Sequence, residues 1–296
     1  MKPKSFHLIP VDLVVLGYML ITALYMLAGS AKLQGVSGHL LTRVFITAAI
    51  FVLAMLDNKK YKTNKVYYFV RNFYPLLLLG YFYKETGYMN NIIFDFFDPW
   101  FAKTEQMLWG MQPSIKFSKL LPQKWFSELM NFGYFFYYLL TLGLALAFFF
   151  WKKNKLQETI FIIFTSFAIY YLFFALFPVK GPQFYFTGAD AQTVDSYFFS
   201  KLVKFAQSMG ETATGAFPSS HVGMSVIFLI LSWKYIRKAF WVILIPVILL
   251  WFATVYIKAH YLIDVMGGFI SAPLVYLSSV WLYCHLTSLR GDSGKE

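Results

Sequence analysis

The sequence predicts an all-α fold, a polytopic transmembrane helical bundle of about six to eight helices with an interfacial helix and a long outward loop. Of the 296 residues, 58% are hydrophobic and only 14% are charged, well below the roughly 25% typical of soluble domains. Apolar runs of about the 20 residues that a helix needs to cross a bilayer recur along the chain. Two longer segments of mixed polarity separate some of these runs, and they provide the interfacial helix and the loop.

Eight apolar runs are expected to form membrane-spanning helices. They cover residues 8–29, 40–56, 67–83, 132–151, 159–177, 218–233, 239–257 and 260–286. The second, third and sixth are the shortest, so the expected number of helices is a range. The first run is too long for a removed signal peptide and lacks a clear small-residue cleavage site, so we expect a retained helix.

The basic residues mark alternate loops. The net charge of +12 suggests nucleic acid as a partner, but no single basic domain exists, so we expect none. In an eight-helix arrangement, 14 of the 26 lysines and arginines fall on one side, namely Lys2, Lys4, Lys59, Lys60, Lys62, Lys65, Lys152, Lys153, Lys155, Lys234, Arg237, Lys238, Arg290 and Lys295. By the positive-inside rule this side is cytoplasmic and holds both termini. The other loops, 30–38, 84–131, 179–217 and the 258–260 turn, then face outward.

The two long outward segments differ in character. In the first, Asp98-Pro99-Trp100 predicts a helix start with an acidic N-cap and proline at the first helical position. The helix would carry Glu105 among its polar residues and lie in the membrane interface; the alternative is a packing element or anchor without a substrate role. The second, 179–217, is rich in aromatic residues, which favours a lid or cap over a site rather than disorder.

The segment 215–221, Gly-Ala-Phe-Pro-Ser-Ser-His, is the first of two histidine motifs. Pro218 suits the first turn of a helix, where backbone N–H groups have no helical partner. These N–H groups and the helix dipole favour an anion such as phosphate. His221 would then donate a proton to the leaving oxygen of that phosphate.

The second motif is His260-Tyr-Leu-Ile-Asp264. Residues four apart on a helix share one face, so Asp264 can accept a hydrogen bond from one imidazole nitrogen and leave the other as a nucleophile. A carboxylate within a spanning helix costs up to about 2.5–3.5 kcal/mol, which indicates function. Each histidine alone could be an ordinary boundary residue, but two on the same predicted face favour catalysis.

Two lysines flank these motifs. Lys180 follows the fifth apolar run, and Lys258 stands two residues before His260. Phosphoryl transfer develops negative charge on the equatorial oxygens, which a cation stabilises. We expect both lysines to hold phosphate, although each alone could be an ordinary interfacial lysine.

At these residues the chain resembles the type 2 phosphatidic acid phosphatase superfamily. The Pro-Ser-Gly-His motif of that family appears as Pro218-Ser219-Ser220-His221, and its His-x-x-x-Asp as His260 to Asp264. The resemblance implies that His260 is a nucleophile forming phosphohistidine, Asp264 its orienting partner and His221 the general acid. It also implies that no metal and no other cofactor is needed.

Two elements of the family pattern are missing. The Ser-Arg that usually opens the third motif is Ala253-Thr254 here, and the usual Lys and Arg-Pro separated by six residues is absent. The variants look more like the inositol phosphorylceramide synthase branch, whose members move a phosphoinositol headgroup onto ceramide, a sphingolipid precursor. By this resemblance the substitute phosphate ligands are Lys180, Gln183 and Lys258, together with Ser219 and Ser220.

These observations predict an integral-membrane enzyme that hydrolyses a lipid phosphate ester at the extracytoplasmic leaflet through phosphohistidine. The alternative is a lipid headgroup phosphotransferase of the synthase type. A transporter or flippase using Asp264 and the lysines is disfavoured, because no broken-helix pair or inverted repeat is visible.

One integrated domain is expected, in which residues 1–125 form N-terminal transmembrane helices and the interfacial segment and residues 126–296 form the catalytic core. The expected partners are a membrane lipid substrate and the phospholipid bilayer, and the expected location is the bacterial inner (plasma) membrane. The sequence does not indicate an oligomeric state.

Overall fold

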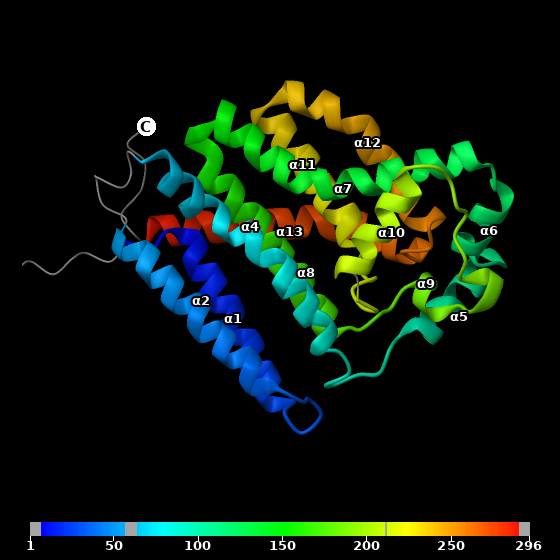
Figure 1. The fold of residues 1–296 in the computed structure, drawn as a ribbon, viewed down its shortest axis with the longest axis horizontal. Helices are drawn as coiled ribbons and strands as arrows, with labels where there is room; N and C mark the ends of the chain where they lie inside the picture. Colours follow the sequence, from blue (N-terminus) through cyan, green and yellow to red (C-terminus); the bar gives the residue numbers. More distant parts are fainter. Residues whose placement is uncertain (1–6, 57–63, 211, 290–296) are drawn as a thin grey trace, which may run out of the picture.

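A computed structural model describes residues 7–56, 64–210 and 212–289, which form a helical bundle without strands (Figure 1). The all-α fold class is thereby confirmed. The α-helices are α1 (Pro10–Ala28), α2 (Val36–Leu56), α4 (Lys65–Tyr88), α5 (Asp98–Trp109), α6 (Pro113–Leu120), α7 (Lys124–Trp151), α8 (Leu156–Leu176), α9 (Pro182–Tyr185), α10 (Phe199–Gly210), α11 (Ser220–Tyr235), α12 (Arg237–Tyr256) and α13 (Leu262–Ser288), and η1 (Lys153–Lys155) and η2 (Gly188–Asp190) are short 3₁₀ turns.

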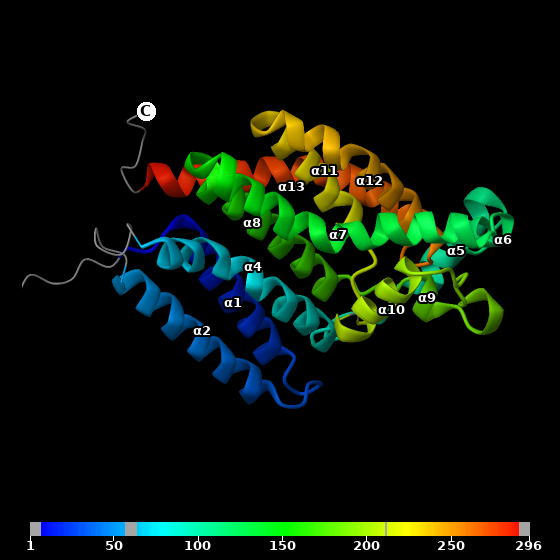
Figure 2. The same cartoon turned by 45° about the horizontal axis from the view of Figure 1, so that its top comes forward.

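Each of the eight expected runs is a helix. Within the described residues, α1, α2, α7, α8, α12 and α13 are long and apolar enough to cross a membrane. The chain is therefore a multi-pass membrane protein. The other two, α4 and α11, lie among these helices (Figures 1 and 2); α4 is rich in tyrosine and carries Arg71, Lys84 and Glu85, and α11 has only 16 residues.

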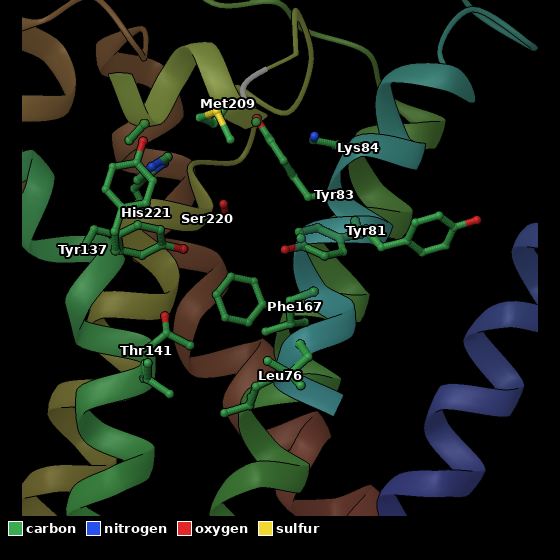
Figure 3. Close-up of a pocket in the computed structure, with 18 of the residues that line it drawn as sticks. Leu76, Tyr81, Tyr83, Lys84, Tyr137, Thr141, Phe167, Met209, Ser220 and His221 are labelled. Atoms are coloured by element: carbon green, nitrogen blue, oxygen red, sulfur yellow. The ribbon is translucent and has the colours of Figure 1, made fainter. Parts of the chain in front are cut away.

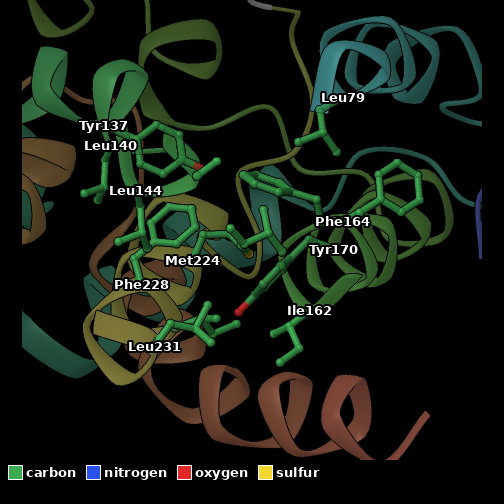
Figure 4. Packing of buried hydrophobic residues seen from close by; sticks show 14 of the residues in the cluster. Leu79, Tyr137, Leu140, Leu144, Ile162, Phe164, Tyr170, Met224, Phe228 and Leu231 are labelled. Atoms are coloured by element: carbon green, nitrogen blue, oxygen red, sulfur yellow. The ribbon is translucent and has the colours of Figure 1, made fainter. Parts of the chain in front are cut away.

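Helix α8 forms the centre of the bundle. It packs against α1, α4, α7, α11 and α13, and 15 of its 21 residues are buried. Figure 4 shows Phe164 and Tyr170 of α8 meeting Leu140 of α7 and Phe228 of α11 in one apolar cluster. The apolar side chains that cover the outside of the bundle, such as Leu77, then face lipid rather than water.

Buried ion pairs join the three N-terminal helices. Arg71 of α4 donates to both carboxylate oxygens of Asp12 in α1, at 2.7 and 2.5 Å. Arg43 of α2 donates to both oxygens of Glu85 in α4, at 2.7 and 2.9 Å. Charges inside a membrane bundle are tolerated when they pair and face its interior, so these pairs hold α1, α2 and α4 in register.

The two ends of the bundle differ. The start of α1, the α7–α8 turn and the end of α13 lie at one end, and α5, α6, α9 and α10 gather at the other (Figures 1 and 2). Seven of the fourteen marker residues, Lys2, Lys4, Lys59, Lys60, Lys62, Arg290 and Lys295, lie outside the described residues.

The two long segments contain more structure than expected. The 179–217 segment includes α9, η2 and α10. Helix α10 begins where it does because Glu128 of α7 accepts hydrogen bonds from the N–H groups of Tyr197, Phe198 and Phe199, at 2.8–3.0 Å.

Helix α5 begins at Asp98 as expected to within one residue, but the prediction that Asp98 is its N-cap was wrong. The N-cap is Phe97. The Asp98 carboxylate instead accepts N–H bonds from Lys180 at 2.9 Å and Gly181 at 3.0 Å, because the 178–181 segment lies against α5.

Candidate active site

The two histidine motifs meet at the end of the bundle that holds α5 and α10. Nδ1 of His221 lies 3.1 Å from Nε2 of His260. The backbone N–H of Ser219 donates to the Asp264 carbonyl at 3.0 Å, which joins the starts of α11 and α13. The two histidines are 39 positions apart in the sequence.

His260 stands before α13 rather than on it, so the expectation of a shared helical face was wrong. The N-cap of α13 is Tyr261, and the Asp264 carboxylate accepts the Tyr261 N–H at 2.7 Å. This capping turn still brings Oδ2 of Asp264 to 3.5 Å from Nδ1 of His260. A closer acceptor for Nδ1 is the carbonyl of Ala216, at 2.8 Å.

These contacts determine the tautomer of His260. Since a carbonyl only accepts hydrogen bonds, Nδ1 of His260 carries the hydrogen that points to Ala216. Nε2 then holds a lone pair and accepts from Nδ1–H of His221. The geometry thus presents the unprotonated nitrogen of one histidine to the other.

His221 is the second residue of α11. Ser219 is the N-cap, and its hydroxyl accepts the Val222 N–H at 3.3 Å. Pro218 therefore precedes the N-cap, and the expectation that it lies in the first turn was wrong. The His221 ring packs against Tyr134 and Tyr137 of α7, with ring centroids 4.9 and 4.3 Å away.

A cavity of about 810 Å³ opens beside His221. Figure 3 shows His221, Ser220 and Tyr137 on one side of it, and Tyr81 and Lys84 of α4 on the other. The side chain of Ser220 forms a hydrogen bond with the hydroxyl of Tyr137. His260 and Asp264 are 3% and 0% exposed, so His221 and Ser220 are the members of the two motifs that line this space.

The predicted phosphate ligands Lys180 and Lys258 direct their ammonium groups elsewhere. Nζ of Lys180 lies 4.2 Å from the centroid of the Phe96 ring. Lys258 is buried and its Nζ donates to the carbonyl of Gln192; burial lowers the pKa of this lysine. The backbone N–H of Gln183 donates to the Lys258 carbonyl at 2.9 Å. This bond places Lys258 beside the segment that contains Lys180 and Gln183.

Two carboxylates of α5 support the histidine motifs, and sequence reasoning missed both roles. Oε1 of Glu105 accepts the N–H of Ile263 at 3.2 Å, and Asp98 accepts the hydroxyl of Tyr261 at 3.2 Å. Both are 0% exposed, whereas Glu105 was expected on a polar face. Burial raises the pKa of Asp98, and burial also raises the pKa of Glu105 to about 7.

The arrangement places a nitrogen lone pair of His260 beside an imidazole N–H of His221, the groups that nucleophilic attack and proton transfer need. Within the part of the chain that the structure describes, no three His, Cys, Asp or Glu side chains gather closely enough to bind a metal ion. The groups that the two motifs bring together are the histidine pair and the Asp264 carboxylate.

Neither the search of curated proteins nor the search of solved structures finds a match. The model of the PAP2 superfamily matches residues 99–278, which is more than half of the chain and includes both histidine motifs. Since the matched region holds these motifs within a multi-pass helical membrane fold, the chain belongs to the PAP2 superfamily, which indicates a phosphatase-type function on lipid phosphates.

Proposed function

We propose that this protein is an integral-membrane phosphatase that hydrolyses a lipid phosphate ester through a phosphohistidine. The observation that carries the proposal is the contact between Nε2 of His260 and Nδ1 of His221 at the end of an apolar cavity. His260 is the nucleophile, His221 the general acid and base, and Asp264 with the Ala216 carbonyl orients the His260 ring.

The reaction has two steps. In the first, the Nε2 lone pair of His260 attacks phosphorus, the bond from phosphorus to the alcohol oxygen breaks, and His221, as the imidazolium, donates a proton to that oxygen and becomes neutral. In the second, His221 takes a proton from water, the water oxygen attacks phosphorus, and the bond from phosphorus to Nε2 breaks. Because His221 contacts Nε2 in this structure, its ring must turn aside when the substrate enters.

The phosphate ligands in this proposal are Ser219, Ser220, Lys180, Gln183 and Lys258. Ser219 and Ser220 directly precede His221 at the start of α11, where N–H groups and the helix dipole favour an anion. Lys180 and Lys258 would need to turn from Phe96 and from Gln192, so their role stays a prediction.

The second candidate is a headgroup phosphotransferase of the inositol phosphorylceramide synthase type, supported by the motif variants in 215–221 and 260–264. The first step is the same, but a lipid hydroxyl replaces water in the second. Incubation with a phosphoinositol lipid and ceramide separates the two: a new phospholipid supports transfer, and free headgroup phosphate without one supports hydrolysis.

The test of the phosphatase is phosphate release from lipid phosphates by the purified protein in detergent, without added metal. We expect His260→Ala to abolish turnover and His221→Ala to lower it by about 10²–10⁴. His285→Ala, at the exposed far end of α13, is the matched control and should match wild type. Turnover by His260→Ala at the wild-type rate would contradict the nucleophile assignment.

The proposed setting is the bacterial inner membrane, with the active site at the extracytoplasmic leaflet and both termini in the cytoplasm. The lysine-rich turn between α7 and α8 lies at the end opposite the histidines (Figure 1), which supports this orientation. We also propose that residues 126–296 form the catalytic core and that residues 1–125 form the N-terminal transmembrane helices and the interfacial segment of the same membrane domain.

A further inference from the structure

The cavity beside His221 has a polar end and an apolar end. Across from His221, the wall that α4 provides carries Tyr83 and Lys84 (Figure 3), and Lys84 is the only lysine or arginine among the described residues that line the cavity. The other end is lined by Phe69, Phe73 and Leu76. Such a gradient suits an amphipathic ligand with an anionic head and a hydrocarbon chain.

The cavity opens sideways between α4 and α7. Leu77 of α4 and Leu142 of α7 both line it, yet they are 79% and 50% exposed, so they also belong to the surface that faces lipid. Helices α4 and α7 each pack on α8. They meet at the apolar end, where Phe69 and Phe73 contact Phe149 at ring-centroid distances of 5.5 and 5.7 Å, and this contact closes that end.

We propose that this cavity binds the membrane lipid substrate, with a hydrocarbon chain entering between α4 and α7 and Lys84 facing the phosphate. The inference rests on the proposed function and adds the route by which the lipid enters, the helices that hold its chain and the lysine that faces its phosphate. Helix α4 lies before residues 99–278, the region that the PAP2 model matches. One wall of this cavity, here called the chamber, and the lysine in it, Lys84, therefore come from the N-terminal helices of this chain.

The structure gives a reason for α4 to stay in place. Thr214, directly before the motif that contains His221, donates its hydroxyl hydrogen to the side-chain oxygen of Asn90 just after α4, at 2.8 Å. The chain of a membrane lipid is already in hydrocarbon before it enters the cavity, so the cavity selects by shape. A long-chain substrate has to fit between α4 and α7, and a chain-free phosphate ester does not.

Gly80 allows a direct test of the chamber. It lines the cavity, and a Cβ there meets nothing within 4 Å, so a side chain at this position starts in open space, and we expect Gly80→Trp to reduce the room in the cavity. Gly143 of α7 also has open space around a Cβ and does not line the cavity, so Gly143→Trp is the matched control. The two substrates are dioleoyl phosphatidic acid and para-nitrophenyl phosphate.

Gly80→Trp should lower kcat/KM for the lipid by about tenfold or more and leave that for para-nitrophenyl phosphate unchanged. Gly143→Trp should change neither. Equal loss on both substrates, or no loss on the lipid, would overturn the chamber.

Lys84 is tested by charge. Lys84→Gln should raise KM for the lipid phosphate by about tenfold, and Lys84→Arg should restore it. Lys103→Gln, an exposed lysine of α5, is the control. An unchanged KM in Lys84→Gln would remove Lys84 from the site.

A binding experiment separates this proposal from the phosphatase itself. A phosphatidic acid with a diazirine at the end of one chain should, after illumination, label residues 69–84 and 134–142, and Gly80→Trp should abolish the label. This readout needs no turnover, so labelling without phosphate release would sustain the chamber and refute the phosphatase. Labels on other helices with intact turnover would refute the chamber alone.

Discussion

At the scale of residues, buried carboxylates place the histidine pair. Asp264 accepts the N–H of Tyr261, Glu105 accepts that of Ile263, and Asp98 accepts the Tyr261 hydroxyl. These three hydrogen bonds hold the turn that carries His260 in one conformation, because breaking any of them would leave a buried polar group unpaired, at a cost of about 1–3 kcal/mol.

The titration of Glu105 provides the first prediction. Its pKa in the folded protein is raised to about 7 from an ordinary value of 4.5. Below about pH 4.5 the carboxyl is protonated in both folded and unfolded chains. As the pH rises to about 7, the unfolded chain ionises first, so the folded state loses stability, on the order of 2–4 kcal/mol.

Glu105→Gln removes this ionisation and keeps an oxygen that can accept the Ile263 N–H. The difference in unfolding midpoint between the variant and wild type should therefore grow in favour of the variant from pH 5 to pH 8, measured by intrinsic fluorescence in detergent. Asp95→Asn, an exposed carboxylate nearby, should follow wild type at both pH values. A constant difference across this range would show that Glu105 does not titrate there.

The sequence identified His221, His260 and Asp264 because each stands in a short motif with its own spacing. It did not identify Asp98 and Glu105 as supports of the site, because their partners lie more than 80 residues away and no local pattern encodes such contacts. The directions of the Lys180 and Lys258 ammonium groups depend on Phe96 and Gln192, which no pattern near either lysine indicates.

At the scale of elements, the membrane-spanning helices could be predicted from the length of the apolar runs, but the residues at which α11 and α13 begin could not. All eight runs are helices, but Pro218 and His260 precede α11 and α13 because Ser219 and Tyr261 act as N-caps. Helix α10 was expected as loop, since Glu128, which caps it, belongs to α7.

The close approach of α11 and α13 provides the second prediction. A Cβ on Gly268 of α13 would lie 2.7 Å from the Ser219 carbonyl oxygen and 2.9 Å from Cβ of Val222. Gly268→Ala should therefore push the two helix starts apart, cost about 1–3 kcal/mol and lower phosphate release, because the histidines sit on these starts.

Melting in detergent and the phosphate assay check both effects. Gly143→Ala has open space around its Cβ and should retain wild-type behaviour. If Gly268→Ala equals this control in stability and turnover, the spacing of α11 and α13 does not determine the site.

At the scale of the whole molecule, the N-terminal helices contact the region that the family model matches. Arg71 and Asp12 join α4 to α1, Thr214 reaches Asn90, and α4 supplies a wall of the cavity beside His221. Composition predicted the bundle and its membrane setting, because apolar length alone indicates spans. It did not predict the cavity, which depends on how α4 and α7 diverge above the aromatic contacts of Phe149.

The orientation of the bundle in the membrane provides the last prediction. The start of α1 and the end of α13 lie at the same end of the bundle (Figure 2), so an even number of spans lies between them. Helices α5 and α10, at the end where the two histidine motifs meet, lie at the opposite end. With Lys152, Lys153 and Lys155 in the turn between α7 and α8 at the first end, the positive-inside rule places that end in the cytoplasm. Green fluorescent protein fused after Glu296 should therefore fluoresce, and alkaline phosphatase inserted in the α1–α2 loop should be active outside. The opposite pair of readouts would place the histidines in the cytoplasm and assign the enzyme to lipids of the inner leaflet.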